Sequence, residues 1–332
     1  MSGPVETLST DGRARTHPPR QLSERLQDLL DVVHVEADGL TAAVGARKLT
    51  ASSPQALTAH LATALYQIVH VGRPESETER APASPDRDLE PRLAQAVPHR
   101  YTAHHVPVLS ATEGALVVGL SSVRVRLDPD RVVRTSDDAQ RAHVRISAAR
   151  PALSPGFFLV DGSLPLPSEA QVLRVYLHVE TPDAAVEAWG RTLECLEERA
   201  VAYRAKAASS SSVLPRRDGV VVYLNGLDQE VLASLVGAVR GIVGLGAGAS
   251  PFTRPLAAGV AVAWEPDDAR PGMRNTSLGE HRSRALASGL VGHATRPDGR
   301  TRTERVREAL IEGGIDPSDP HRNLSSPAPS PN

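Results

Sequence analysis

The clearest periodic signal in the chain is an alternation of apolar and polar side chains over residues 172–179, VLRVYLHV. A period of two predicts a β-strand, because successive side chains of a strand point to opposite faces. Arg174, Tyr176 and His178 would lie on one face of this strand, and only aliphatic side chains on the other. We therefore expect the aliphatic face to pack on a core and the polar face to be available for chemistry.

Residues 201–207, VAYRAKA, repeat the alternation and place Arg204 and Lys206 on one face of a second predicted strand. Lys206 is also unusual in composition, since the chain has 37 basic residues and only Lys48 and Lys206 are lysines. A buried lysine can lose its proton and act as a base, which an arginine essentially cannot do. If the two strands share a sheet with matching faces, their polar residues form a surface suited to a phosphorylated substrate. Chance retention of the lysine is the alternative.

The remaining pattern indicates an α+β protein with N-terminal helices, a small β-meander and a C-terminal mixed sheet flanked by helices. Segments without periodicity that are rich in polar residues and proline are expected to be tails or linkers. In chain order, the predicted regions are a disordered tail (1–20), a helical N-terminal region (21–72), a linker (73–92), a β-rich region (93–168), a catalytic domain (169–314) and a second disordered tail (315–332).

A predicted helix after Ser277 adds candidate anion contacts. Ser277 and Glu280 have the spacing of a capping box, and Arg282 lies four residues from Leu278, on the helix face that should point inward. An inward arginine needs an anion, and the free N–H groups of a helix N-terminus also favour one. His281 and Arg282 are therefore candidate phosphate contacts. The alternative for Arg282 is a side chain that snorkels at the edge of the apolar stripe.

The pair Arg216-Arg217 precedes another predicted strand, VVVYL. One of the two guanidinium groups could make a bidentate contact with a phosphate while Asp218 orients it. A solvated hairpin corner is the alternative. The glycine-rich segment 244–248, GLGAG, follows a helix instead of a strand, so we interpret it as a connector and not as a phosphate loop.

Composition argues against several classes of protein. A formal net charge of −2 and an aromatic content of 3% argue against nucleic-acid binding. No apolar run approaches the roughly 18 residues that cross a bilayer, and the N-terminus lacks the apolar core of a secretory signal. We therefore expect a cytoplasmic protein without a membrane partner. The single cysteine, Cys195, and the isolated pair His104-His105 predict no metal site, and we expect no cofactor.

Four segments together resemble a known family: RVYLHV, AYRAKAASSSSVLPRRDGVVVYL, LAAGVAVAWEP and SLGEHRSRALASGL. Over about residues 105–293 the chain resembles the HopA-type effector family, whose actinobacterial relatives act as lyases in thioviridamide-type and class V lanthipeptide biosynthesis. Two positions depart from the family pattern, since Leu278 replaces a usual aromatic residue and Leu214 a common tyrosine. The resemblance implies a phosphothreonine-lyase-like fold for the C-terminal domain.

The HopA-type family is similar in its reactive residues to the phosphothreonine lyases of enteric pathogens, which use a lysine base, a histidine acid and arginines around the phosphate. By this resemblance Lys206 corresponds to the base and His178 to the acid. The side chains that the resemblance implies around the phosphate are Arg204, Arg217 and Arg282, with Arg174, Arg216, Tyr176 and Asn275 matching by position alone.

These matches imply a lyase that removes a Cα proton and expels phosphate from phosphoserine or phosphothreonine, giving dehydroalanine or dehydrobutyrine. The expected substrate is a ribosomally made precursor peptide with a leader and a core. A separate Ser/Thr peptide kinase would phosphorylate it, because no nucleotide-binding motif is present in this sequence. The alternatives are a non-catalytic, effector-like interaction protein and a kinase-bound scaffold that has lost catalysis.

Overall fold

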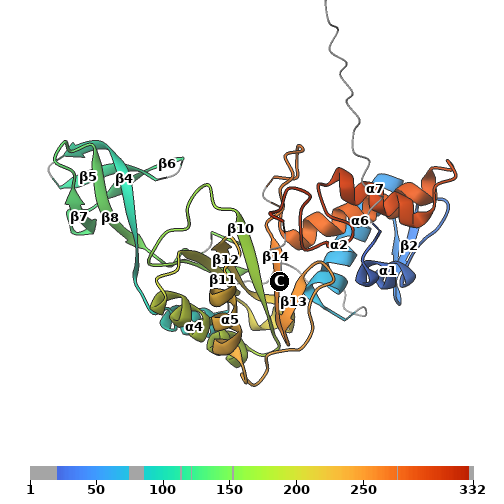
Figure 1. Ribbon diagram of the computed structural model, residues 1–332, viewed down its shortest axis with the longest axis horizontal. Coiled ribbons are helices and arrows are strands. Elements are labelled where there is room, and N and C mark those ends of the chain that lie inside the picture. The colour runs from blue at the N-terminus through green and yellow to red at the C-terminus, as the bar shows by residue number, and fades with distance from the viewer. Residues whose placement is uncertain are drawn as a thin grey trace, which may run out of the picture.

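The computed structural model describes residues 21–74, 86–112, 114–120, 122–151, 153–274 and 276–328. Within these ranges the chain forms seven α-helices and three antiparallel sheets, which confirms the predicted α+β class. A six-stranded sheet occupies the middle of the molecule (Figure 1). A five-stranded sheet projects from one side of it, and the helices of the two ends of the chain gather on the other side.

The central sheet has the strand order β13-β14-β10-β12-β11-β9. Its strands are β9 (Phe157–Asp161), β10 (Val172–Val179), β11 (Tyr203–Ala208), β12 (Arg216–Asn225), β13 (Arg254–Ala257) and β14 (Val260–Trp264). The two predicted strands at 172–179 and 201–207 are confirmed as β10 and β11, and both pair with β12, which lies between them. The sheet is antiparallel throughout, where a mixed sheet was expected.

One face of the central sheet packs on α4 (Pro182–Glu198) and α5 (Gln229–Val239). Trp189 of α4 is fully buried in this core, and its indole N–H donates to the carbonyl of Leu93 over 3.0 Å. Leu93 belongs to α3 (Leu89–Gln95), which begins inside the segment 73–92 that we expected to be a linker. Leu89 explains this difference, because burying one leucine contributes about 2 kcal/mol. Residues 75–85 of that segment lie outside the described residues.

Elements from both ends of the chain cover the opposite face. They are α1 (Glu24–Asp31), β1 (Val33–Val35), β2 (Thr41–Val44), β3 (Arg47–Thr50), α2 (Pro54–Leu65), the π-helix η1 (Tyr66–Val71), α6 (Leu278–Thr295) and α7 (Arg302–Glu312). Leu57 of α2 and Leu286 of α6 share one core with Tyr176 and Val221 of the central sheet. The sheet β1–β3 was not predicted, because strands of three or four residues are too short to show a period.

Residues 315–328 are packed on the molecule, although we expected a disordered tail from 315 onward. Asp316, His321 and Asn323 are buried, and Ile315 pairs with Asn323. The prediction was wrong because it counted apolar side chains, whereas backbone carbonyls of this segment bind the buried Arg282. Residues 1–20 and 329–332, which belong to the two predicted tails, lie outside the described residues.

The five-stranded sheet, called the arm below, has the order β6-β5-β4-β8-β7. It consists of β4 (Tyr101–Thr112), β5 (Ala115–Leu120), β6 (Val123–Leu127), β7 (Val132–Thr135) and β8 (Arg141–Ser147), with the short 3-10 helix η2 (Pro129–Arg131) between β6 and β7. Val106, Val118 and Val144 form its small core. β9 pairs with β11 in the central sheet, so the expected boundary between 168 and 169 separates β9 from the sheet to which it belongs.

Candidate functional site

The pairing of β10, β12 and β11 brings the predicted reactive side chains to one face of the central sheet. Tyr176 and Lys206 lie on either side of Val221 in one row across the sheet. His178 follows two residues after Tyr176 on the same face, since its chain neighbours are buried in the core on the opposite face. Strand spacing and rise place the Cα atoms of His178 and Lys206 about 12 Å apart. Two side chains at this separation can reach the two ends of one substrate residue.

Lys206 is half-buried and its ammonium nitrogen lies 4.1 Å from the ring centroid of Phe157 on the neighbouring strand. It makes no hydrogen bond or ion pair with any residue that the structure describes. The aromatic face stabilises the cation only weakly compared with a carboxylate. The ammonium group is therefore not held by a carboxylate of the described residues.

His178 has its imidazole fixed by one hydrogen bond. Its Nδ1 lies 3.1 Å from the carbonyl oxygen of Gly248, and a carbonyl only accepts, so Nδ1 carries the hydrogen and Nε2 is left for a substrate. Burial lowers the pKa of His178, and the charge of Arg217 lowers it further. The carboxylates of Glu180 and Asp218 raise the pKa, but by less. The ring is mainly neutral at pH 7, and a phosphate beside it would raise its pKa again.

The segment 244–248, which we interpreted as a connector, is built around His178. The backbone N–H of Gly246 donates to the carbonyl of His178 over 2.9 Å. A Cβ on Gly246 would lie 2.4 Å from the His178 ring, and one on Gly248 would lie 3.3 Å from Nε of Arg217. The segment can therefore approach both side chains only because it is glycine-rich.

Arg216 and Asp218 form a buried ion pair, with Nε and Nη2 of Arg216 donating to the carboxylate over 2.8 and 2.9 Å. Burial raises the pKa of Asp218, but Arg216 outweighs burial and holds that pKa well below its usual range. Nη2 of Arg216 also donates to the hydroxyl of Tyr66 over 3.3 Å. Because Asp218 occupies the guanidinium fork, Arg216 is not free for the bidentate phosphate contact that we expected of it.

Arg217 differs from Arg216 in having no carboxylate partner among the described residues. Its Nη1 donates to the carbonyl of Val69 over 2.9 Å, and the side chain is half-buried close to Gly248. Burial lowers the pKa of Arg217, and the nearby charge of Arg25 lowers it further. Of the two adjacent arginines, Arg217 is therefore the one whose charge is available to an anion beside His178.

Arg204 and Arg174, both predicted phosphate contacts, are paired with carboxylates of the protein. Nε of Arg204 donates to Asp161 over 2.6 Å, and the buried Arg174 makes a bidentate ion pair with Glu265. Both pair with Tyr223 of β12, whereas Lys206 pairs with Val221, so both lie two residues further along the sheet from His178 than Lys206 does. Their charges are already compensated, which suits a structural role for each.

Tyr176 is also on this face, and its hydroxyl is buried without a hydrogen-bond partner among the described residues. Burial raises the pKa of Tyr176, while the nearby guanidinium of Arg174 lowers it less, so the phenol stays protonated. A buried hydroxyl with no partner is a donor that a substrate oxygen can satisfy. Asn275, predicted by position alone, lies outside the described residues.

Arg282 and His281 have other partners than a phosphate. The fully buried Arg282 donates from Nε to the carbonyl of Pro320 and from Nη2 to Asn323, over 3.1 and 2.7 Å. Its Nη1 lies 2.7 Å from Nδ1 of His281, whose Nε2 lies 2.8 Å from Asp268. These contacts tie α6 to the segment after 315 and give the pair an anchoring role, while the expected phosphate contact of the pair stays a prediction.

His70 of η1 is the residue of this site that the sequence did not reveal. It is 3% exposed, its Nδ1 lies 3.0 Å from Oγ of Ser250, and its ring meets Tyr176 edge-on at 5.6 Å. Burial lowers the pKa of His70 to about 4. The carboxylate of Asp218 acts in the opposite direction, and nearby cations, Lys206 among them, lower the pKa further. The imidazole is therefore neutral and lies over the row that holds Tyr176 and Lys206.

The hydrogen bond between His70 and Ser250 is compatible with either tautomer of the imidazole, because a hydroxyl both donates and accepts. Oγ of Ser250 also accepts from the backbone N–H of Phe252 over 3.2 Å. When Ser250 donates to Nδ1 of His70, Nε2 carries the hydrogen, and Nε2 makes no hydrogen bond with a described residue. A π-helical turn often marks a functional site, but YQIVHV looks like a simple continuation of α2 in sequence.

Comparison with known proteins places this chain in a family. The chain matches the HopA1 effector protein family over residues 148–322, more than half of its length, and it belongs to that family. The matched region contains His178 and Lys206, whereas His70 and all five strands of the arm precede it.

Two solved structures are similar to this chain, both at 15% identity. The effector protein from Pseudomonas syringae pv. syringae strain 61 gives a TM-score of 0.43, and the match covers 73% of this chain and 86% of the effector chain. The effector protein from Pseudomonas syringae pv. tomato strain DC3000 gives a TM-score of 0.44, and the match covers 80% of this chain and 97% of the effector chain. No curated protein matches the chain. Among the described residues, no helix is long and apolar enough to span a bilayer.

Proposed function

We propose that this protein is a lyase that eliminates phosphate from phosphoserine or phosphothreonine residues of a ribosomally made precursor peptide. The observation that carries the proposal is the shared face of Lys206 and His178. Lys206 has no acidic partner among the described residues, and Nδ1 of His178 is bound to Gly248 so that Nε2 is free. A base and an acid at opposite ends of one substrate residue are what β-elimination needs.

In this mechanism the neutral amine of Lys206 takes the Cα proton of the phosphorylated residue. The electron pair of that C–H bond forms the Cα=Cβ double bond, and the bond between Cβ and the phosphate oxygen breaks. Protonated His178 gives its Nε2 proton to the leaving oxygen, and Arg217 compensates the charge of the phosphate. The products are dehydroalanine or dehydrobutyrine and inorganic phosphate.

His70 and Tyr176 have the properties of donors to the substrate carbonyl. As the Cα proton leaves, negative charge develops on the carbonyl oxygen next to Cα. The hydroxyl of Tyr176 and Nε2–H of His70 lack partners among the described residues and lie over the row of Lys206. Preorganised neutral donors of this kind lower the barrier where charge develops. We assign them this role as part of the proposal.

The precursor's phosphate would be supplied by a separate Ser/Thr peptide kinase, and leader and core would both belong to the substrate. The test is mass spectrometry of a phosphorylated precursor incubated with the full chain, together with thiol trapping of any dehydroamino acid. Loss of phosphoric acid with a trappable product supports the lyase. A phosphopeptide that binds and stays intact contradicts it.

A second candidate function is a non-catalytic, effector-like interaction protein. The observation in its favour is that Arg174, Arg204 and Arg216 are each paired with a carboxylate of the chain, which leaves few free cations for a phosphate. Such a protein would bind a partner without changing it. The same incubation separates the two functions, because only a lyase releases inorganic phosphate. A kinase-bound scaffold would also leave the phosphopeptide intact.

A further inference from the structure

One face of the arm carries an uncompensated set of cations. Alternate residues of a strand share a face, so Arg141, His143 and Arg145 of β8 lie together, while Ala142 and Val144 point into the arm core. Strand pairing extends this face across the sheet. The set, called the basic face below, is Arg124, Arg126, Arg134, Arg141 and Arg145 with His105 and His143, all exposed.

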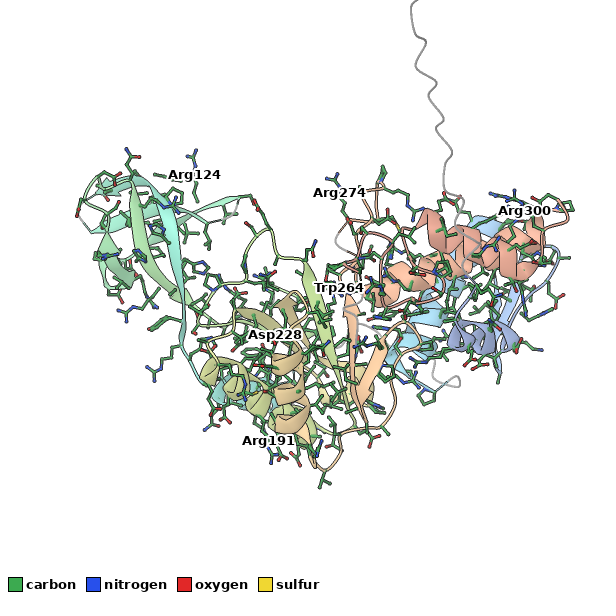
Figure 2. The ribbon with its side chains drawn as sticks, viewed as in Figure 1. Arg124, Arg191, Asp228, Trp264, Arg274 and Arg300 are labelled. Atoms are coloured by element: carbon green, nitrogen blue, oxygen red, sulfur yellow. The ribbon has the colours of Figure 1, made fainter. Side chains whose placement is uncertain are left out.

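The strand register confirms that these residues are neighbours. His143 pairs with His105 on β4 and with Arg134 on β7, and the two imidazoles stack with centroids 4.4 Å apart. On the other side of β4, Gly119 pairs with Arg124, and a Cβ on Gly119 would lie 3.2 Å from Pro107, the partner of Arg141. Figure 2 shows Arg124 at the surface of the arm.

No arginine of the basic face has an acidic partner among the described residues. Arg141 donates to the carbonyl of His105 over 2.9 Å, and Arg145 lies 5.7 Å from the ring of Tyr101. The described acidic residues of the arm are instead in its turns, where Asp130 pairs with Arg131. Packing seven cationic or ionisable side chains on one face without a counter-charge costs free energy through repulsion, which a bound anion would offset.

We propose that the basic face is a docking surface for an acidic peptide segment in extended conformation. Same-side residues of an extended peptide repeat every 6.8 Å or so, as do Arg141, His143 and Arg145 along β8, so carboxylates on alternate residues face these three side chains in turn. Single-stranded nucleic acid fits less well, because it needs aromatic platforms for its bases. The ring of Tyr101, which the pairing places on this sheet, is already covered by Arg131 and Arg145.

The docking surface lies on the arm, apart from the polar face of the central sheet (Figure 1). It would therefore hold a segment of a partner that is distant in sequence from any residue bound at Lys206. If the proposed lyase function holds, that segment is the leader of the precursor, and this identification rests on the proposed function. The binding itself does not depend on catalysis, so the two can fail separately.

The test uses the full chain and a fluorescein-labelled peptide of alternating Glu and Ser, with fluorescence anisotropy read over a salt series. The variant R124Q/R126Q/R145Q removes three charges from the basic face. The matched control is R87Q/R240Q/R296Q, which removes three exposed arginines elsewhere. We expect the first variant to bind about tenfold more weakly with a shallower salt dependence, and the control to bind like the wild type.

Equal affinity of the two variants would overturn the proposal, as would tighter binding of a single-stranded oligonucleotide of the same charge. The side chains of Arg124 and Arg126 make no hydrogen bond or ion pair with a described residue, so R124Q/R126Q provides a second variant should the triple variant lower the melting temperature. A short phosphopeptide without an acidic segment should be processed equally by the wild type and R124Q/R126Q/R145Q. This last comparison separates loss of docking from loss of the proposed lyase activity.

Discussion

Nδ1 of His178 donates to the carbonyl oxygen of Gly248 over 3.1 Å, and this bond decides which nitrogen of the ring meets a substrate. Nε2 is left free, on the face of the central sheet that also holds Lys206. The same glycine-rich segment approaches Arg217, so the side chains of His178 and Arg217 are positioned by one segment of the chain. In the proposed reaction this arrangement makes the proton donor and the anion contact depend on each other.

The pH dependence of the reaction tests the role of His178. The acid must be protonated, so the rate falls as pH rises through its pKa. Burial lowers the pKa of His178 in the free protein, and a bound phosphate raises it. We expect the falling limb of kcat to lie at higher pH than that of kcat/KM, measured by phosphate release, and His178→Asn to cost roughly a hundredfold or more in kcat. Coincident limbs in the two profiles would contradict this role.

Gly246→Ala tests the glycine-rich segment. The added Cβ would lie 2.4 Å from the ring of His178, so the imidazole must move off Gly248. We expect kcat to fall by roughly tenfold to a hundredfold, since misplacing a catalytic group by about an ångström has effects of this size. Gly237→Ala is the matched control, because a Cβ there meets nothing within 4 Å and lies in α5. Equal activities of the two variants would show that the segment is only a connector.

Burial of His70 predicts that stability depends on pH. Its pKa is lowered from 6.5 to about 4, so below pH 6.5 the unfolded chain binds a proton that the folded chain does not. The free energy of unfolding should therefore fall as pH drops from 6.5 to about 4, by on the order of 3 kcal/mol from this group. His70→Phe keeps the ring contacts and removes the titration. The measurement is urea unfolding over this pH range. If His70→Phe shows the same pH dependence as the wild type, His70 is not a neutral, buried imidazole in the folded protein.

Arg282→Ala tests the anchoring of the segment after 315. It removes hydrogen bonds to Pro320, Arg322 and Asn323, and it takes from the carbonyl of Pro320 and from Oδ1 of Asn323 the donor that Arg282 supplies. Such losses cost about 3 to 5 kcal/mol, so we expect the melting temperature to fall by roughly 10 °C. Deletion of residues 316–332 should have an effect of the same direction. A stable Arg282→Ala protein with weakened phosphopeptide binding would restore the phosphate role that its position in α6 suggested.

Local periodicity was sufficient to predict much of this fold. The strands β10 and β11 and the helices α4, α6 and α7 follow from patterns of period two or 3.6, and the capping box of Ser277 and Glu280 is formed. Alternation also gives the polar face of each strand, and the strand VVVYL, now part of β12, was predicted as well. The position of β12 between β10 and β11 was not predicted, because periodicity shows which face a residue is on but not which strands pair.

The parts that were missed depend on contacts between distant segments. His70 is over 100 residues from His178, and its role rests on Ser250 and Tyr176, neither of which is close to it in sequence. Arg282 points inward as expected, and its described partners are the carbonyls of Pro320 and Arg322 and the side chains of His281 and Asn323, none of which its position in α6 indicated. A sequence pattern can indicate that a buried polar side chain needs a hydrogen-bond partner. Only the tertiary structure shows which residue that partner is.

The most direct test of the central claim is the elimination rate of Lys206→Arg on a phosphorylated precursor. Arginine keeps the positive charge and can stay near Phe157, but it cannot accept the Cα proton at neutral pH. Lys48→Arg is the matched control, since it changes the only other lysine, an exposed residue of β3. We expect Lys206→Arg to bind the phosphopeptide, as measured by anisotropy, but to release no phosphate, and Lys48→Arg to behave like the wild type. Elimination by Lys206→Arg at a rate close to that of the wild type would contradict this expectation.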